Sequence, residues 1–293
     1  MENMLDRMMK KGVARLIERG GTRYFSNWPF ILGMWEAQVD KLTPEFIAEF
    51  EEYIHDLAFG VEFLTRGFSQ MRTIPIEQSI PFDRHVTTYD HVTQIINRSD
   101  GPFLIIECIC RKFAAMKGNP CQKTSRLEVC MVLGDWARNY IESGTGREIS
   151  KAEALEIIRQ NEADGLVLQP SNTQRVEFIC SCCSCCCMML GAHKMMPKPV
   201  DFWITNHYAA IDSDNCTGCG DCVERCQVDA ISMDEGLGIA VIDLDRCIGC
   251  GVCVPACSME AISLIKKEEE AVPPVDLESL HDSIMAKSRG NAG

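Results

Sequence analysis

The chain has 293 residues, of which 46% are hydrophobic and 24% are charged, as is ordinary for a globular protein. Its formal net charge of −13 argues against nucleic acid as a partner of the whole protein. No apolar run approaches the roughly 20 residues that a membrane helix requires. The first residues lack the basic-then-apolar order of a secretory signal, so we expect a cytoplasmic protein without a membrane span.

Cysteine is the residue that stands out, with 18 in the chain. Disulfides would account for them in a small secreted protein, but this chain is large and shows no export signal. Thiols at short spacing in a reducing compartment favour metal sites instead. They form one group between Cys108 and Cys130, a second between Cys180 and Cys187, and two more from Cys216 onward.

Residues 1–27 predict a small unit, with a basic helix over 5–12 and then a hairpin that turns at Gly20-Gly21. This order resembles the recognition helix and wing of a winged-helix domain, so we interpret it as a winged-helix-like remnant. The resemblance implies DNA contact through a basic face. That face would consist of Arg7, Lys10, Lys11, Arg15 and Arg19. A plain docking unit is the alternative, and the acidic charge of the chain favours it.

Residues 28–200 are predicted to form a mainly helical, cysteine-rich domain with short strands. Helix-start patterns, such as Thr43 before Pro44 and the capping box of Ser150 and Glu153, mark its helices. The expected helices run from Pro44 towards Gly67, from a cap at Asp90 through Ile96, from Leu127 to Ile141, and from Ser150 to Asn161. Apolar runs over 103–106 and 176–179 predict two strands that end in cysteines.

An internal repeat is the strongest pattern in the sequence, and it lies within residues 201–265. A run with the spacing C-x2-C-x2-C-x3-C recurs 31 residues later, since it starts at Cys216 and again at Cys247. Three thiolates two residues apart fit one tight loop around three corners of an iron–sulfur cubane. We expect each half of the repeat to contain a strand, a cysteine loop, a helical turn and a second strand.

Residues 204–265 resemble the two-cluster bacterial ferredoxins, in which the fourth cysteine of each run ligates the other cluster. The resemblance implies two [4Fe-4S] clusters. One would be held by Cys216, Cys219, Cys222 and Cys257, and the other by Cys247, Cys250, Cys253 and Cys226. The family usually has proline after the fourth cysteine, whereas Gln227 and Ser258 stand there in this chain. Structural zinc is the alternative, but such sites usually pair two C-x2-C knuckles far apart.

The ten upstream cysteines are candidate ligands of one or two further iron–sulfur clusters. They are Cys108, Cys110, Cys121, Cys130, Cys180, Cys182, Cys183, Cys185, Cys186 and Cys187. Six thiols within eight residues are too many for packing alone, because unligated thiolates so close would repel or oxidise. Ten thiols suffice for two cubanes with two left over. Arg111 and Lys112 beside the first pair would offset the negative charge of a thiolate-bound cluster.

Residues 266–293 predict a charged linker and a docking helix. The linker holds Lys266 to Glu270 and then Pro273-Pro274. Leu277, Leu280 and Ile284 follow as one narrow apolar stripe on a short helix. Such a helix is marginal in water by itself, so it must lie on a surface. That surface is either a partner subunit or the N-terminal domain of this chain.

The chain as a whole resembles poorly characterised multi-cysteine 4Fe-4S ferredoxin-domain proteins of anaerobic bacteria. The residues that carry this resemblance are Cys108 to Arg111, Cys121, Cys130, the octet 180–187 and the repeat. It implies a multi-cluster electron-transfer protein that acts as a subunit or redox partner of an anaerobic oxidoreductase. The predicted fold class is α+β, and no nucleotide motif or catalytic residue is recognised. A catalytic reductase that uses an upstream cluster and a redox-sensing regulator are the alternative functions.

Overall fold

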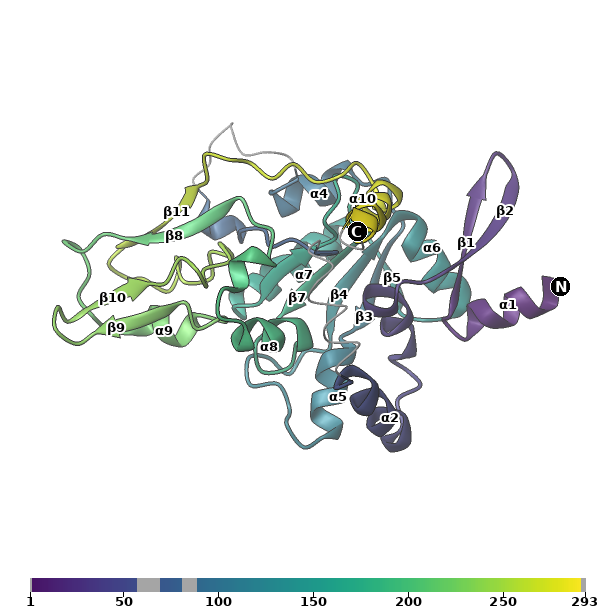
Figure 1. The fold of residues 1–293 in the computed structure, drawn as a ribbon, viewed down its shortest axis with the longest axis horizontal. Coiled ribbons are helices and arrows are strands. Elements are labelled where there is room, and N and C mark those ends of the chain that lie inside the picture. Colours follow the sequence, from purple (N-terminus) through teal and green to yellow (C-terminus); the bar gives the residue numbers. More distant parts are fainter. Residues whose placement is uncertain (1, 57–68, 81–88, 291–293) are drawn as a thin grey trace.

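The structure is a computed structural model that describes residues 2–56, 69–80 and 89–290. A five-stranded antiparallel sheet lies in its middle. The C-terminal module of short strands extends from one side of this sheet, and the N-terminal helix and hairpin lie at the opposite end (Figure 1). Both helices and sheets are present, as the α+β class requires. None of the helices in the described ranges is long and apolar enough to cross a membrane.

The central sheet has the strand order β5-β3-β4-β7-β6, with each neighbouring pair antiparallel. Its strands are β3 (Phe103–Glu107), β4 (Glu128–Leu133), β5 (Arg147–Ile149), β6 (Val167–Pro170) and β7 (Phe178–Cys182). The predicted strand at 103–106 is confirmed, and the one at 176–179 begins two residues later and continues into the cysteines. Strands β3 and β7, which the sequence separates widely, are both neighbours of β4 and so end near each other.

The predicted helix from Leu127 to Ile141 is wrong in its first half. Residues 128–133 form β4, and helix α6 (Gly134–Ser143) begins only at Gly134, whose φ is 59°. The apolar run of β4 is buried between β3 and β7, and a run buried on both sides lacks the alternation that identifies a strand. Cys130 therefore lies on a strand and not on a helix.

Helix α7 (Lys151–Ala163) begins where the sequence predicts. The Ser150 hydroxyl accepts the backbone N–H of Glu153 at 3.1 Å, which satisfies one donor of the first turn. The Glu153 carboxylate pairs with Arg147 and does not complete the capping box. Helices α6 and α7 both pack on β3 and β4. Together with the sheet they form the main hydrophobic core.

The predicted cap at Asp90 is wrong, because that side chain has other partners. Helix α4 (Val92–Arg98) begins after His91 with no side-chain cap. The buried Asp90 carboxylate pairs with the Arg72 guanidinium and accepts the Asn206 amide at 2.9 Å. A buried ion pair needs such additional hydrogen bonds to offset its desolvation. The pair ties residues 69–80 and the start of α4 to the C-terminal module.

The N-terminal unit contains the predicted helix and hairpin, as α1 (Glu2–Lys10), β1 (Ala14–Arg19) and β2 (Thr22–Asn27). The hairpin is fixed to α6, because Asn139 exchanges two hydrogen bonds with the backbone of Leu16. Arg15 lies over the rings of Trp28 and Trp136 and not on an open basic face. The winged-helix interpretation stays a prediction.

Short helical segments connect this unit to the sheet. Trp35 lies between the first two segments, and Glu36 begins the second; both residues line a cavity together with cysteines. The segments are a π-helical turn (Phe30–Met34), a 3-10 turn (Glu36–Gln38), α2 (Pro44–Ile54) and a second 3-10 turn (Glu77–Ser79). Thr43 caps α2 by accepting the Phe46 N–H, as predicted. The expected continuation of α2 towards Gly67 lies largely outside the described residues.

The C-terminal module has two antiparallel strand pairs, β8 with β11 and β9 with β10. Its elements are a 3-10 turn (Pro199–Asp201), β8 (His207–Ile211), α9 (Asp221–Arg225), β9 (Ile231–Asp234), β10 (Ile239–Ile242) and β11 (Ile262–Lys266). The predicted order of strand, cysteine loop, helical turn and strand is confirmed in the first half of the repeat, whereas residues 252–256 of the second half form a turn and not a helix. Arg225 donates to the carbonyls of Glu162 and Ala163 at the end of α7, so the module is anchored on that helix.

Helix α10 (Leu277–Gly290) follows the linker. Leu277, Leu280 and Ile284 are all buried in the main core of this chain. Backbone N–H groups of Gln174 and Arg175 donate to Pro274 and Val275 just before the helix. The structure therefore agrees with the alternative in which the stripe lies on the chain's own N-terminal domain, and the stripe is not free for a partner subunit.

The buried carboxyl of Glu177, beside the start of α10, makes the stability of the chain depend on pH. Burial raises the pKa of its carboxyl from 4.5 to about 7, although the hydroxyls of Thr173 and Ser171 and the N–H of Leu277 hydrogen bond to it. Because this pKa is raised on folding, the contribution of Glu177 to stability is full below pH 4.5. It is lost as pH rises through about 7.

We therefore expect Glu177→Gln to flatten the pH dependence of unfolding. Between about pH 5.5 and about pH 7.5, the variant should lose roughly 1–2 kcal/mol less of its unfolding free energy than the parent chain does. Denaturant unfolding at the two pH values measures this. Glu142→Gln, at an exposed position on α6, is the control. Equal slopes in the parent and Glu177→Gln would contradict the prediction.

Candidate metal centres

The first ferredoxin-type cysteine group surrounds one hollow of the C-terminal module. Cys216, Cys219 and Cys222 lie on the loop before and at the start of α9, and Cys257 reaches the same hollow from the second repeat. Cys219 is exposed, whereas Cys222 is buried. The structure thus brings together the four cysteines that the crossed ligand pattern pairs.

The second group is Cys247, Cys250 and Cys253 with Cys226 from the first repeat. The first three are buried, and burial is the main cause that raises the pKa of each, with the neighbouring cysteines of the group adding to it. Burial therefore disfavours the free thiolate form of these three side chains. This group faces the interior, and the first faces the surface.

Two glycines allow the cysteine loops to lie against the strands. A side chain at Gly218 would come within 2.1 Å of the Gly238 carbonyl, and one at Gly249 within 2.2 Å of the His207 carbonyl. Both have positive φ, which side chains other than glycine rarely adopt. Three backbone N–H groups of the module also donate hydrogen bonds to ligand sulfur atoms. Those of Ala209, Ala230 and Ala261 donate to Cys247, Cys226 and Cys257 at 3.3–3.4 Å.

Six of the upstream cysteines form what we call the thiol ring. Each thiol shifts the pKa of the next in the order Cys108, Cys110, Cys187, Cys182, Cys180, Cys130 and back to Cys108, so the six are neighbours in this order. They come from four elements: the end of β3 with the start of α5 (Ile109–Met116), strand β4, strand β7, and the start of α8 (Met188–Met195). All six line one cavity.

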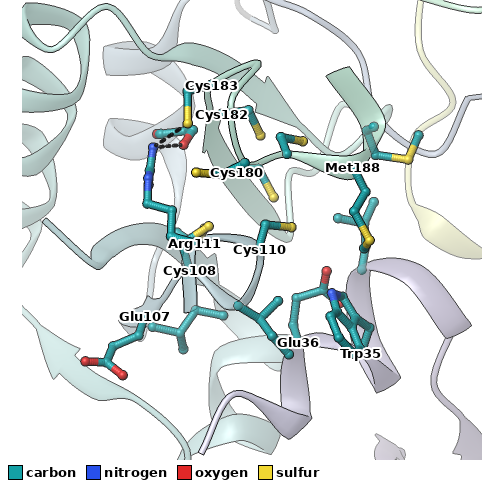
Figure 2. Close-up of a pocket in the computed structure, with 18 of the residues that line it drawn as sticks. Trp35, Glu36, Glu107, Cys108, Cys110, Arg111, Cys180, Cys182, Cys183 and Met188 are labelled. Carbon is teal, nitrogen blue, oxygen red and sulfur yellow. Dashed lines mark hydrogen bonds between the residues drawn. The ribbon is translucent and has the colours of Figure 1, made fainter. Parts of the chain in front are cut away.

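Strand alternation explains how β7 contributes to this ring. Cys180 and Cys182 are two residues apart and so lie on one face of the strand. Ser181 points to the other face, where its hydroxyl accepts the Asn161 amide of α7 at 2.8 Å. The cysteine face is covered by Trp35, Glu36 and Met188, which line the cavity with the thiols (Figure 2).

The electrostatics of the ring centre on Cys108. Hydrogen bonds from Cys110 and Cys130, followed by the charge of Arg111, lower the pKa of its thiol well below 9.0. The same hydrogen bonds raise the pKa of Cys110 and Cys130. Glu36 lies nearby, and burial raises the pKa of its carboxyl to about 7.

The remaining four upstream cysteines form a second group, which we call the thiol tetrad. Its members are Cys121, Cys183, Cys185 and Cys186, whose four sulfur atoms all lie within 4.8 Å of one another. Hydrogen bonding from Cys186 is the main cause that lowers the pKa of Cys183 to about 5, and the Arg111 charge acts in the same direction. Cys182 and Cys183 are adjacent in sequence but belong to different groups.

Arg111 lies between the ring and the tetrad. The residue is 1% exposed. Arg111 donates to the sulfur atom of Cys183 at 3.6 Å and to the Ser181 carbonyl (Figure 2), and also to the sulfur atom of Cys121 at 3.4 Å. Burial opposes its charge, but Cys108 and Cys183 outweigh this and raise its pKa. Its Nη1 atom is buried with no hydrogen-bond partner among the described residues. An anionic group in the cavity would satisfy that donor, so the residues fit a cluster there.

Gln227 joins the ferredoxin-type module to the octet. It replaces the proline of the ferredoxin pattern directly after Cys226, and it is fully buried. Its Oε1 atom accepts the N–H of Ser184 at 3.0 Å and the hydroxyl of Ser184 at 3.2 Å, and its amide donates to the Gly165 carbonyl. The sequence shows that Gln227 replaces proline. Nothing in the sequence indicates its hydrogen-bond partner, Ser184, which lies 43 residues upstream.

Comparison with known proteins identifies one part of the chain. The family model of a 4Fe-4S dicluster domain matches residues 209–264. No curated protein matches the chain. The match supports a ferredoxin-type domain with at least one iron–sulfur cluster, and the expected whole-chain resemblance receives no support from it.

Proposed function

We propose that this chain is an electron-transfer protein that passes single electrons between a surface cluster and a buried centre in the thiol ring. The two ferredoxin-type groups would each hold a [4Fe-4S] cluster, with the crossed ligand sets of the sequence pattern. The thiol ring would hold a third iron–sulfur cluster. When bound, these clusters supply the one-electron chemistry, and the chain sets their positions and surroundings.

The observation that carries this proposal is the order of the sites. Cys219 exposes the first site, the second site is buried behind it, and Gln227 links the second site directly to the octet. An electron that enters from a partner at the exposed site would move inward along this order. A subunit or redox partner of an oxidoreductase fits such a linear arrangement.

The chain's own donors suit clusters that become more negative on reduction. The three backbone N–H groups that donate to Cys247, Cys226 and Cys257 stabilise charge on the ligand sulfur atoms. Arg111 does the same for the upstream thiols. The 18 cysteines form no disulfide, which suits a reducing, cytoplasmic compartment.

A reductive titration of the anaerobically purified full chain tests the proposal. We expect the chain to accept about three electrons, one for each cluster, with three distinguishable reduced EPR species. Two electrons together with about eight iron atoms would show that no upstream cluster exists. Absence of any reducible cluster would overturn the electron-transfer function.

The catalytic reductase is the weaker candidate. It requires an iron atom that no cysteine ligates, so that substrate can bind there. The thiol ring offers six thiols, more than the four that a cubane needs. The redox-sensing regulator would use the basic face of the N-terminal unit. Arg15 of that face lies over two tryptophan rings, whereas Arg7, Lys10 and Lys11 are exposed.

Gln227→Pro should loosen the contact between the module and the octet without removing the module's clusters. Proline restores the residue usual after a ferredoxin cysteine, but it leaves the Ser184 N–H and the Gly165 carbonyl without their partner. Each buried unsatisfied group costs about 1–3 kcal/mol. We expect slower electron exchange with the upstream centre and a lower unfolding midpoint.

Ser258→Pro is the matched control, because Ser258 holds the same place in the second repeat and is exposed. Rapid-freeze EPR after partial reduction follows the redistribution of electrons in both variants. If Gln227→Pro and Ser258→Pro behave alike, the Gln227 link does not couple the two regions.

A further inference from the structure

We propose that the thiol tetrad binds a single metal ion in tetrahedral tetrathiolate coordination, and not a cubane. The ten upstream cysteines would then serve two sites of different kinds, a six-thiol site for a cluster and a four-thiol site for one ion. This inference concerns a metal site of its own and holds whether or not the chain carries electrons.

The sulfur–sulfur distances carry the proposal. Cys121 lies 3.5 Å from Cys183 and 3.8 Å from Cys185. Cys185 lies 3.5 Å from Cys183 and 3.7 Å from Cys186. A tetrahedral ion with metal–sulfur bonds of about 2.3 Å separates its sulfur atoms by about 1.63 times that length, or about 3.8 Å. Four of the six edges of such a tetrahedron thus have nearly this length, and the other two pairs of sulfur atoms lie within 4.8 Å.

A cubane does not fit this spacing. Its four thiolates bind four different iron atoms at separate corners, so they stand further apart than thiolates that share one ion. The tetrad is the only set of three or more such ligand atoms within 4.8 Å of one another in the parts of the chain that the structure describes. No three thiols of the ferredoxin-type groups or of the thiol ring lie that close together, so the tetrad differs from them in spacing.

The donor set indicates a closed site. Four thiolates leave no open position on a tetrahedral ion, which is typical of structural zinc and also of mononuclear iron–sulfur sites. Four thiolates on a divalent ion carry a net charge of about −2, and Arg111 donates to two of the four sulfur atoms. The ion would join the loop after α5, which provides Cys121, to the octet.

The metal-to-sulfide balance of the full chain tests the proposal. Every cubane contributes equal numbers of iron atoms and acid-labile sulfides, whereas a tetrathiolate ion contributes one metal and no sulfide. We expect the anaerobically purified chain to hold about one more metal ion than sulfide. Zinc or iron as the extra metal distinguishes the two forms of the site, and both support it. Equal numbers of metal and sulfide would overturn it.

A pair of variants assigns the extra ion to the tetrad. Cys121→Ser with Cys185→Ser should remove the surplus metal while leaving sulfide at the parent level. Cys219→Ala should lower iron, and sulfide with it where the whole cluster is lost, but should leave the ion of the tetrad in place. Loss of sulfide in the first variant would mean that the tetrad ligates a cluster.

Where the surplus metal is zinc, X-ray absorption at the zinc edge of the parent chain gives an answer even if the variant fails to fold. Four sulfur neighbours at about 2.3 Å with no metal neighbour are expected. A metal–metal distance at that edge would overturn the single-ion site.

Discussion

Alanine in place of Cys219 should remove or degrade one cluster while the other ferredoxin-type cluster stays. Cys219 is the exposed ligand of its group, so an iron atom that loses it faces solvent. We expect a loss of at least one and up to about four iron atoms per chain. The EPR signal of one reduced cluster should disappear, and that of the buried site should persist. Metal analysis with EPR on the anaerobic protein measures both.

The crossed pattern of ligands makes the result specific. Cys257→Ala should affect the same cluster as Cys219→Ala, although the two residues belong to different repeats. Cys226→Ala should affect the other cluster. Thr217→Ala, at an exposed position beside the ligands, is the control and should keep full occupancy. Both clusters at full occupancy in Cys219→Ala would refute the ligand assignment.

The ferredoxin-type module was predictable because its information is local. Each run of cysteines lies within one loop, and the second copy repeats the first with the same strand and glycine positions. The spacing therefore indicated both the elements and the grouping. The partner of Gln227 could not be predicted in the same way, because the hydrogen bond depends on how the module packs on the octet.

The division of the upstream cysteines was beyond the sequence for a related reason. Cys182 ends strand β7, and the chain turns directly afterwards, so Cys183 joins the tetrad although it also lines the cavity of the ring. Whether a turn begins before or after a given cysteine of the octet decides which group that cysteine joins. The sequence predicted that Cys130 lies on a helix. It lies on β4 instead, and only from this strand can its thiol interact with that of Cys180 on β7.

Arg111→Met should have the largest effect on the upstream sites. Methionine fills similar space but removes a buried positive charge that contacts two tetrad sulfur atoms and acts on Cys108. Removal of one partner from a buried charge pair typically costs about 3–5 kcal/mol, because the remaining charge has no compensation. We expect loss of the surplus metal ion, loss of most upstream iron and a large fall in stability.

The spectroscopic pattern separates this role from general destabilisation. The reduced EPR signals of the two ferredoxin-type clusters should survive in Arg111→Met, because Arg111 contacts neither group. Lys112→Met is the control at the next position, where the side chain pairs with Glu107 and is partly exposed. It should keep all metal.

Arg111→Lys keeps the charge but loses the planar guanidinium group, which donates to two sulfur atoms and a carbonyl at once. This variant should retain an intermediate amount of upstream metal. A graded loss from arginine through lysine to methionine is what charge compensation with fixed geometry requires. If Arg111→Met instead retained the parent content of upstream iron and of the surplus ion, the thiols would hold their metals without compensation. Arg111 would then be a packing residue alone.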